Sequence, residues 1–177
     1  MPCAPLPPDE AARLALLESY AILDTPPESA FDSIVARAAA LFATPMAALS
    51  LVDRDRFWFK ARLGIAVRDL PRSAAFCAYA ILGDDVLTVE DAAADARFDD
   101  NPFVYGEAGI RFYAGAPLIS PGKGRLGSLC VLDRAPRPAT PAQATALAQL
   151  AREAMARLEV RRVLEDATGL FLAPRAR

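Results

Sequence analysis

The chain has 177 residues, of which 54% are hydrophobic and 24% charged, and its net charge is −2. This composition predicts one folded domain with a core of its own and excludes a disordered chain. The basic residues form no concentrated face, and no stretch reaches the roughly 18 apolar residues of a membrane span, so neither nucleic acid nor a membrane is expected as a partner.

The chain contains no histidine and three cysteines. This excludes His-ligated haem, His-containing zinc sites, and Ser-His-Asp or Cys-His catalysis. Three cysteines are also too few for a four-thiolate metal site, so no metal, no cofactor and no catalytic residue is expected. The odd cysteine count and the Pro-rich start, which lacks a secretory signal, indicate a reducing compartment, the cytoplasm.

Local composition predicts three segments. Residues 1–8, with proline at positions 2, 5, 7 and 8, are expected to be a disordered arm. Residues 9–166 are expected to form a single domain that includes the terminal helices. Residues 167–177, which contain glycine and proline, are expected to be a flexible tail.

A first long helix is predicted after a short one near residues 9–21. Thr25, Pro26 and Glu28 have the spacing of a capping box with proline in the first turn. Apolar residues then recur at spacings of three and four from Phe31 to Phe42, as on the buried face of an amphipathic helix. Pro45 ends the pattern.

From residue 46 the period changes to two, which indicates strands. The expected elements are a hairpin of residues 47–52 and 57–61, a helix from Ser73 to Ile81, a strand at 86–89, a polar loop at 91–111, and a second hairpin of 111–118 and 126–132. Hairpins imply antiparallel pairing. The fold class is therefore α/β in the α+β sense, with a central antiparallel sheet of five to six strands, terminal helices on one face and a helix-and-loop lid over the other.

The last helix is predicted to begin at a second capping box, formed by Thr140 and Gln143, and to run to about residue 166. Its apolar positions have a spacing close to a heptad repeat, which predicts a weak pairing seam with another helix. The seam consists of Leu147, Leu150, Ala154, Leu158, Arg161 and Glu165.

Because strand side chains alternate between the two faces of a sheet, the strand residues divide into two sets. One set is apolar and is expected to pack on the helices: Leu49, Leu51, Phe57, Phe59, Phe112, Ala114, Ala116, Leu129 and Val131. The other set mixes aromatic rings, hydroxyls, cations and a thiol: Ser50, Trp58, Lys60, Arg111, Tyr113, Ser128 and Cys130. The second set has the make-up of a small-molecule cleft, although a half-solvated face packed under a lid fits it equally well.

Several motifs, in this order, resemble those of bacterial GAF domains. They are Leu23 to Glu28 with Phe31-Asp32, Ser50 to Asp53, Trp58-Phe59-Lys60, Phe76-Cys77-Ala78, Asp99 to Pro102, Ile110 to Leu118, and Leu126 to Asp133. The likeness spans roughly residues 10–165. It implies a sensory module of the kind found upstream of histidine kinase and diguanylate cyclase domains, with a ligand cleft under the lid, dimerisation through the terminal helices, and a signalling partner in trans or an output domain in a longer chain.

The resemblance adds three residues to the expected site. With Phe76, Cys77 and Asn101, the predicted ligand-binding residues are Ser50, Trp58, Lys60, Phe76, Cys77, Asn101, Arg111, Tyr113, Ser128 and Cys130. The chain departs from two branches of the family. The residue constellation of the cyclic-nucleotide-binding branch is missing, and Cys77 lacks the adjacent histidine of the bilin-binding branch, so neither ligand is expected.

Three functions follow from these observations. The leading hypothesis is a non-catalytic sensor that binds a small molecule and transmits the signal through its terminal helices as a homodimer. The enzyme alternative is a GAF-type free methionine-(R)-sulfoxide reductase, which requires Cys77 and Cys130 to lie close together. The third is a ligand-free dimerisation module whose cleft is filled by large side chains such as Trp58, Phe76 and Tyr113.

Overall fold

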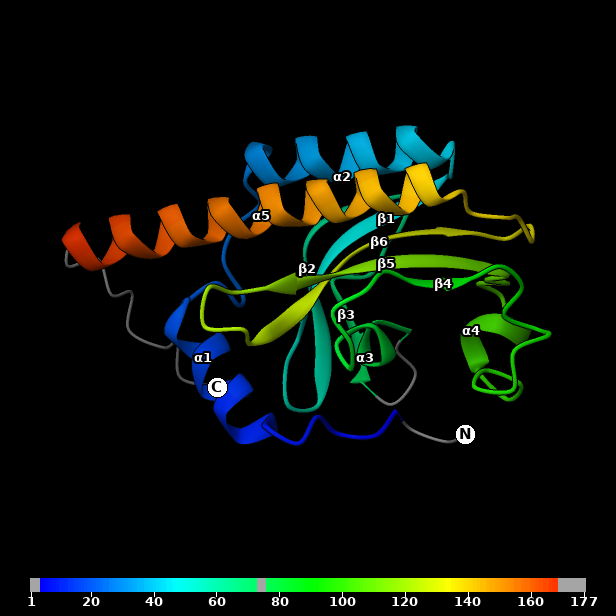
Figure 1. The fold of residues 1–177 in the computed structure, drawn as a ribbon, viewed down its shortest axis with the longest axis horizontal. Coiled ribbons are helices and arrows are strands. Elements are labelled where there is room, and N and C mark those ends of the chain that lie inside the picture. The colour runs from blue at the N-terminus through cyan, green and yellow to red at the C-terminus, as the bar shows by residue number, and fades with distance from the viewer. Residues whose placement is uncertain (1–3, 73–75, 169–177) are drawn as a thin grey trace.

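The computed structural model describes residues 4–72 and 76–168. In these ranges one antiparallel sheet has the strand order β3-β2-β1-β6-β5-β4 (Figure 1). The strands are β1 (Met46–Val52), β2 (Arg56–Leu63), β3 (Asp69–Pro71), β4 (Leu87–Val89), β5 (Phe112–Ile119) and β6 (Arg125–Asp133). The helices are α1 (Glu10–Ser19), α2 (Ser29–Phe42), α3 (Phe76–Ala80), α4 (Pro102–Tyr105) and α5 (Pro141–Thr168).

Two layers cover the two faces of the sheet. Helices α2 and α5 lie side by side on one face (Figure 1), where apolar residues such as Phe31, Leu49, Phe112 and Leu147 form the helix-side cluster. On the other face α3, α4 and their loops supply residues such as Phe76 and Phe98 to the lid-side cluster. The predicted fold class is confirmed, with a sheet of six strands in the described residues.

Some predicted boundaries change. The short strand β3 pairs with β2 at Leu70 and Pro71, where the sequence favoured the approach to a helix. The predicted helix start at Ser73 lies outside the described residues, as do residues 1–3 of the predicted arm and 169–177 of the predicted tail. Residues 4–7 form neither helix nor strand, yet Ala4 packs against the lid-side cluster.

The two predicted capping boxes have different outcomes. At α5, Gln143 N donates to Thr140 Oγ1 at 3.2 Å and Thr140 N donates to Gln143 Oε1 at 3.0 Å, so this box is confirmed. The box at Thr25 is wrong: α2 begins at Ser29, and Thr25 Oγ1 instead accepts from Lys60 Nζ at 2.8 Å. Lys60 also binds the carboxylate of Glu28, the N-cap residue of α2, whose side chain forms no capping hydrogen bond.

The predicted pairing seam of α5 packs inside the domain. Leu147, Leu150, Ala154 and Leu158 are all buried in the helix-side cluster. A helix that covers a sheet needs an apolar stripe just as a coiled coil does, so the spacing alone could not tell the two apart. This seam is therefore not free to bind a second helix.

Helix α1 is attached to the sheet through a buried arginine. Arg13 is 1% exposed, and its Nη1 donates to the Val52 carbonyl at 2.6 Å while its other nitrogens bind Glu10. Arg72, just after β3, donates to both Glu10 and the Asp53 carbonyl. Burial by itself raises the pKa of Glu10, but the hydrogen bonds and charges of Arg13 and Arg72 outweigh it and lower this pKa to about 2.

We expect Glu10→Gln to lower the free energy of unfolding at pH 7 by about 1 kcal/mol, because a charged acceptor of two arginines is lost from a partly solvated site. The folded-state pKa of Glu10 lies below the ordinary value of 4.5, so its contribution is complete above that value and is lost as the pH falls toward about 2. Urea unfolding between pH 3 and 7 should show the two proteins converging in acid. The control Glu18→Gln, at an exposed position of the same helix, should match wild type throughout.

Candidate functional site

Five polar side chains meet between the centre of the sheet and α3. Ser50, Ser128 and Cys130 come from β1 and β6, Tyr113 from β5 and Cys77 from α3; we call them the buried polar cluster. All five are buried, and Ser50, Tyr113 and Ser128 are fully enclosed. Buried polar groups are costly unless they are paired, so this concentration of them in an apolar layer marks the candidate site.

Strand register brings the cluster together. Ser50 pairs with Ser128 across β1 and β6, so both side chains point to the same face. Cys130 lies two residues further along β6 and faces Gly115 on β5. Tyr113 is two residues from Gly115, so it shares this face as well.

A chain of contacts links all five side chains. Ser50 Oγ lies 3.3 Å from Ser128 Oγ, and the Tyr113 hydroxyl lies 3.3 Å from the same atom. The Tyr113 hydroxyl donates to Cys77 Sγ at 3.6 Å, and Cys77 Sγ lies 4.0 Å from Cys130 Sγ. Cys130 Sγ in turn donates to the Ala48 carbonyl at 3.6 Å. The polar groups of the cluster therefore satisfy one another.

The same contacts separate the acidities of the two thiols. The contact with Cys130 lowers the pKa of Cys77 against the effect of burial, with help from Ser128, Ser50 and Tyr113. The contact with Cys77 and burial raise the pKa of Cys130 well above its usual value. Burial likewise raises the pKa of Tyr113, which stays a hydrogen-bond donor. Of the two thiols, Cys77 is the one to which the Tyr113 hydroxyl donates, a contact that stabilises the thiolate form.

Aromatic rings cover the cluster. Phe76 stacks on Tyr113 with the ring centroids 5.1 Å apart and the planes at 16°. The ring centroid of Phe98, from the loop before α4, lies 4.3 Å from that of Phe76. The ring of Tyr79 contacts Phe98 edge-on. These offset and edge contacts are favourable geometries for aromatic pairs. Together they hold α3 and the loop against the sheet.

Sequence reasoning missed two residues that shape the site, Gly115 and Phe98. A Cβ added to Gly115 would lie 2.1 Å from the Tyr113 hydroxyl oxygen, so only glycine leaves room for the ring to lie along the strand. A lone glycine inside a strand pattern is a known sign of such a close approach and was the available signal. The sequence carries no comparable signal for Phe98, because this residue lies in a loop without periodicity.

The predicted site residues on β2 face the other way. Trp58 belongs to the helix-side cluster, whereas Phe57 and Phe59 belong to the lid-side cluster, so the predicted assignment of these three was wrong. The pairs Leu51–Trp58 and Ser50–Phe59 set the register. The faces predicted from the sequence place the two strands of this hairpin one residue out of step, and a one-residue slip exchanges the faces.

Lys60 is also on the helix side, at a β-bulge. Leu49 pairs with Ala61 and Ser50 with Phe59, which leaves Lys60 as the extra residue. Its fully buried side chain donates to Glu28 Oε1 at 2.6 Å and to the Pro26 carbonyl at 2.7 Å. Burial lowers the pKa of Lys60, and the contact with Glu28 opposes that shift.

The same Glu28 carboxylate binds α5. Arg161 Nε donates to Glu28 Oε1 at 3.1 Å, and Arg161 also forms an ion pair with Glu165. Lys60, Glu28 and Arg161 therefore join the sheet, the start of α2 and the far half of α5 in one charged network. This network, rather than a ligand cleft, accounts for the predicted site residue Lys60.

The two remaining predicted residues have local partners away from the cluster. Asn101 is the N-cap of α4, where its Oδ1 accepts from Phe103 N at 2.8 Å. Arg111 binds the Asp91 carboxylate through two hydrogen bonds of 2.7 Å. The structure thus brings together Ser50, Cys77, Tyr113, Ser128 and Cys130 with Phe76 above them, and leaves Trp58, Lys60, Asn101 and Arg111 elsewhere.

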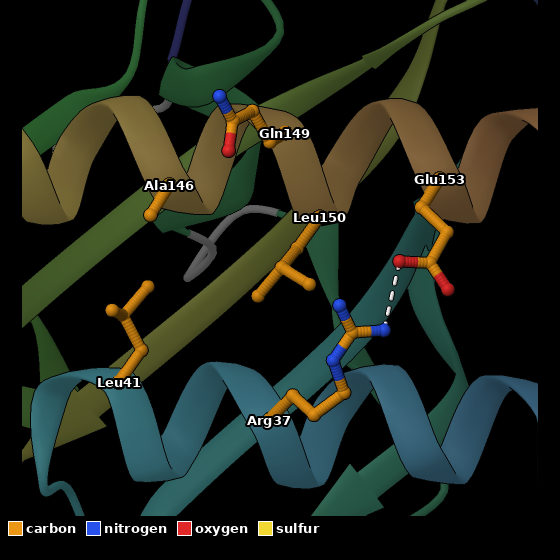
Figure 2. A pocket seen from close by; sticks show the side chains of 6 residues that line it. All are labelled: Arg37, Leu41, Ala146, Gln149, Leu150 and Glu153. Atoms are coloured by element: carbon orange, nitrogen blue, oxygen red, sulfur yellow. Dashed lines mark hydrogen bonds and ion pairs between the residues drawn. The ribbon is translucent and has the colours of Figure 1, made fainter.

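A groove of about 450 Å³ opens on the opposite side of the molecule, between α2 and α5 (Figure 2). Leu41 and Leu150 supply its apolar part, and Arg37 reaches across it to Glu153 at 2.8 Å. The Arg37–Glu153 pair lies on an open surface, whereas the polar cluster is shielded from solvent, so polar contacts to a ligand would be weaker in the groove than in the cluster.

In residues 4–72 and 76–168, no group of three or more His, Cys, Asp or Glu side chains is arranged to hold a metal ion. None of the helices in that part of the chain is long and apolar enough to cross a membrane.

We expect Gly115→Ala to reduce the free energy of unfolding by about 1–3 kcal/mol, because the added methyl group overpacks a ring that Phe76 holds in place. Urea titration measures the loss, and near-ultraviolet circular dichroism should report the displaced tyrosine. Gly83→Ala is the matched control, since a Cβ there meets nothing within 4 Å. Equal stability of the two variants would show that Tyr113 does not lie over Gly115.

The GAF domain family model matches residues 26–158. The chain is 44% identical over 175 residues to a Pseudomonas aeruginosa protein named cyclic di-GMP phosphodiesterase, a match that covers 97% of this chain and 30% of the relative. The chain therefore spans about a third of the length of the curated relative that it matches.

Solved structures agree in fold. A GAF domain of an Acinetobacter phosphoenolpyruvate-protein phosphotransferase superimposes with a TM-score of 0.64 and 18% identity, covering 94% of this chain and 99% of that one. A free methionine-R-sulfoxide reductase of Neisseria meningitidis, in complex with its substrate, gives 0.62 and 19%, with 87% and 92% covered. At these identities the likeness concerns the fold alone. The match of the family model over most of the chain shows that the protein belongs to the GAF domain family.

Proposed function

We propose that this chain is a non-catalytic regulatory GAF domain of the cytoplasm, which binds a small molecule at the buried polar cluster and passes the signal on through α5. The observation that carries the proposal is the cluster itself. Five polar groups gather in the apolar layer under α3, at the middle of the sheet, where packing alone would favour apolar side chains. Ligand sites combine apolar walls with a few such polar groups.

The covering layer determines what a ligand must do to bind. The cluster is enclosed, so a ligand has to displace Phe76 and with it the five-residue helix α3. Local opening of a short segment costs less free energy than global unfolding, so α3 can open while the sheet stays folded. Binding and movement of the lid are thus coupled, as regulation requires.

The charged network offers a route from the sheet to α5. Lys60 is on β2, one strand away from Ser50, and reaches Arg161 through Glu28. A shift of β1 or β2 on binding would change how this network holds the far half of α5. The relative from Pseudomonas aeruginosa, most of whose length lies outside the matched region, suggests an output of the cyclic di-GMP phosphodiesterase kind.

We further propose that a second copy binds the outward face of α5. Val160, Val163 and Leu164 are each about 60% exposed there, and this half of the helix runs past the end of the sheet (Figure 1). Exposed apolar residues at helical spacing are typical of helix pairing. This face replaces the predicted seam, which is buried in the helix-side cluster.

A second candidate is a ligand-free structural module. The stacking of Phe76 on Tyr113 and Phe98 fills the space above the cluster, as that hypothesis requires. The reductase alternative gains the expected closeness of Cys77 and Cys130. Both sulfurs are nevertheless almost fully buried, so an amino-acid substrate reaches neither without displacement of α3.

To test the ligand, the protein purified from its host under reducing conditions is examined by native mass spectrometry. We expect a reproducible added mass that is lost on denaturation, and expect Ser128→Ala to lose it because a hydroxyl at the centre of the cluster is removed. Ser33→Ala, at an exposed position of α2, should keep it. Bare protein, together with no thermal shift in a small-molecule screen, would favour the structural module instead.

To test the dimer, Val160→Glu and Val163→Glu are combined and compared with wild type by sedimentation equilibrium. We expect the double variant to dissociate at least tenfold more readily, about 1.4 kcal/mol or more, because the charges would be buried between apolar faces. Ala142→Glu adds negative charge at the exposed start of the same helix and should leave the dimer intact. A wild-type protein that stays monomeric at high concentration contradicts this part of the proposal.

A further inference from the structure

Cys77 and Cys130 have the geometry of a dithiol that can close. Their sulfurs lie 4.0 Å apart, one on α3 and the other on β6. A disulfide needs a separation of about 2 Å, so the sulfurs must approach by roughly a further 2 Å. The five-residue helix α3 carries one of them, whereas the other is fixed in the centre of the sheet.

The two thiols have different hydrogen-bond partners. The Tyr113 hydroxyl donates to Cys77 Sγ at 3.6 Å, a contact that stabilises a thiolate there. Cys130 donates to the Ala48 carbonyl, which suits the protonated thiol. A nucleophile with a resolving partner in contact is the arrangement of thiol redox sites.

Small-molecule binding does not require two thiols in contact, since single polar groups on apolar walls are enough to orient a ligand. Two thiols in contact, with a hydroxyl that donates to one of them, instead have what disulfide formation requires. All three groups lie in the described part of the chain, and no ligand is needed to bring them together.

We propose that Cys77 and Cys130 form a reversible disulfide when a hydroperoxide oxidises Cys77, which makes this face of the sheet a peroxide-responsive site. The Cys77 thiolate attacks the terminal oxygen of the hydroperoxide, the O–O bond breaks, and Cys77 becomes a sulfenic acid. The departing alkoxide, or hydroxide when the oxidant is hydrogen peroxide, takes up a proton. The Cys130 thiol then attacks the Cys77 sulfur, the S–O bond breaks, and the leaving hydroxide combines with the Cys130 proton as water.

Two electrons pass from the thiols to the hydroperoxide. Two thiols and one hydroperoxide give one disulfide, one alcohol or water from the oxidant, and one water from the sulfenic acid. A small-molecule dithiol reverses the reaction by exchange. Hydrogen peroxide is close to water in size, so it needs only a local opening beside α3. This distinguishes it from a substrate as large as an amino acid.

The disulfide would join α3 to β6. In the proposed function a ligand displaces α3, so oxidation would hold the site closed; this consequence rests on the proposed function, whereas the disulfide itself does not. Oxidised protein should then carry none of the added mass that reduced protein carries in native mass spectrometry. Failure of ligand binding in both states would contradict the proposed function and leave the disulfide measurement unaffected.

The experiment uses the full chain with Cys3→Ser, so that Cys77 and Cys130 are the two cysteines left. After exposure to stoichiometric hydrogen peroxide and alkylation under denaturing conditions, we expect the intact mass to show two unalkylated cysteines and the loss of two hydrogens. Peptide mapping should find the Cys77–Cys130 link, and dithiothreitol should restore both thiols.

Single variants assign the roles. Cys130→Ser should stop at the sulfenic acid of Cys77, which dimedone captures, whereas Cys77→Ser should leave Cys130 unmodified at the same peroxide dose. Tyr113→Phe should slow the oxidation of Cys77 several-fold, while circular dichroism confirms that each variant is folded. Folded Cys3→Ser protein that keeps both thiols under excess peroxide, or that reaches sulfinic acid without forming the disulfide, overturns the proposal.

Discussion

The pairing of β1 with β6 at the centre of the sheet is the contact on which the rest of the structure depends. These strands are far apart in the sequence and run together from Met46–Leu132 to Leu51–Gly127. The backbones approach closely at Gly127, where an added Cβ would lie 1.9 Å from the Ser50 carbonyl oxygen. This register places Leu49 and Leu129 toward the helices and Ser50 and Ser128 toward the lid. Both layers and the candidate site follow from that one alignment.

The two faces of the sheet differ in physical character. The helix-side cluster is large and apolar and carries most of the hydrophobic burial, which gives the domain its stability. The lid-side cluster encloses polar groups and thiols and is covered by α3 and α4, each one turn or little more in length. The helix-side face therefore supplies most of the stability, and in the proposed function the lid-side face is the one that moves, since a short covering helix can move without exposing the helix-side cluster.

Charged residues connect elements that the sheet does not join. Arg13 ties α1 to the end of β1, and Glu28 joins the β-bulge at Lys60 to Arg161 on α5. Arg13 and Lys60 are buried, so each needs its partner in place. These contacts tie the terminal helices to the sheet, as the proposed route from the sheet to α5 requires.

The sequence by itself determined the family, the antiparallel sheet, the cap of α5 and four of the site residues on β1, β5 and β6. Those predictions rest on local patterns: alternation within a strand, helical spacing, and capping chemistry. Tertiary structure alone decided which face β2 presents, because Trp58 and Phe59 alternate correctly in either register and the pairing of Leu51 with Trp58 across the hairpin sets the one observed. It also decided that the α5 stripe covers the sheet, since an apolar stripe does not specify its partner. The contact between Cys77 and Cys130 likewise depends on how α3 packs on β6, which no spacing along the chain encodes.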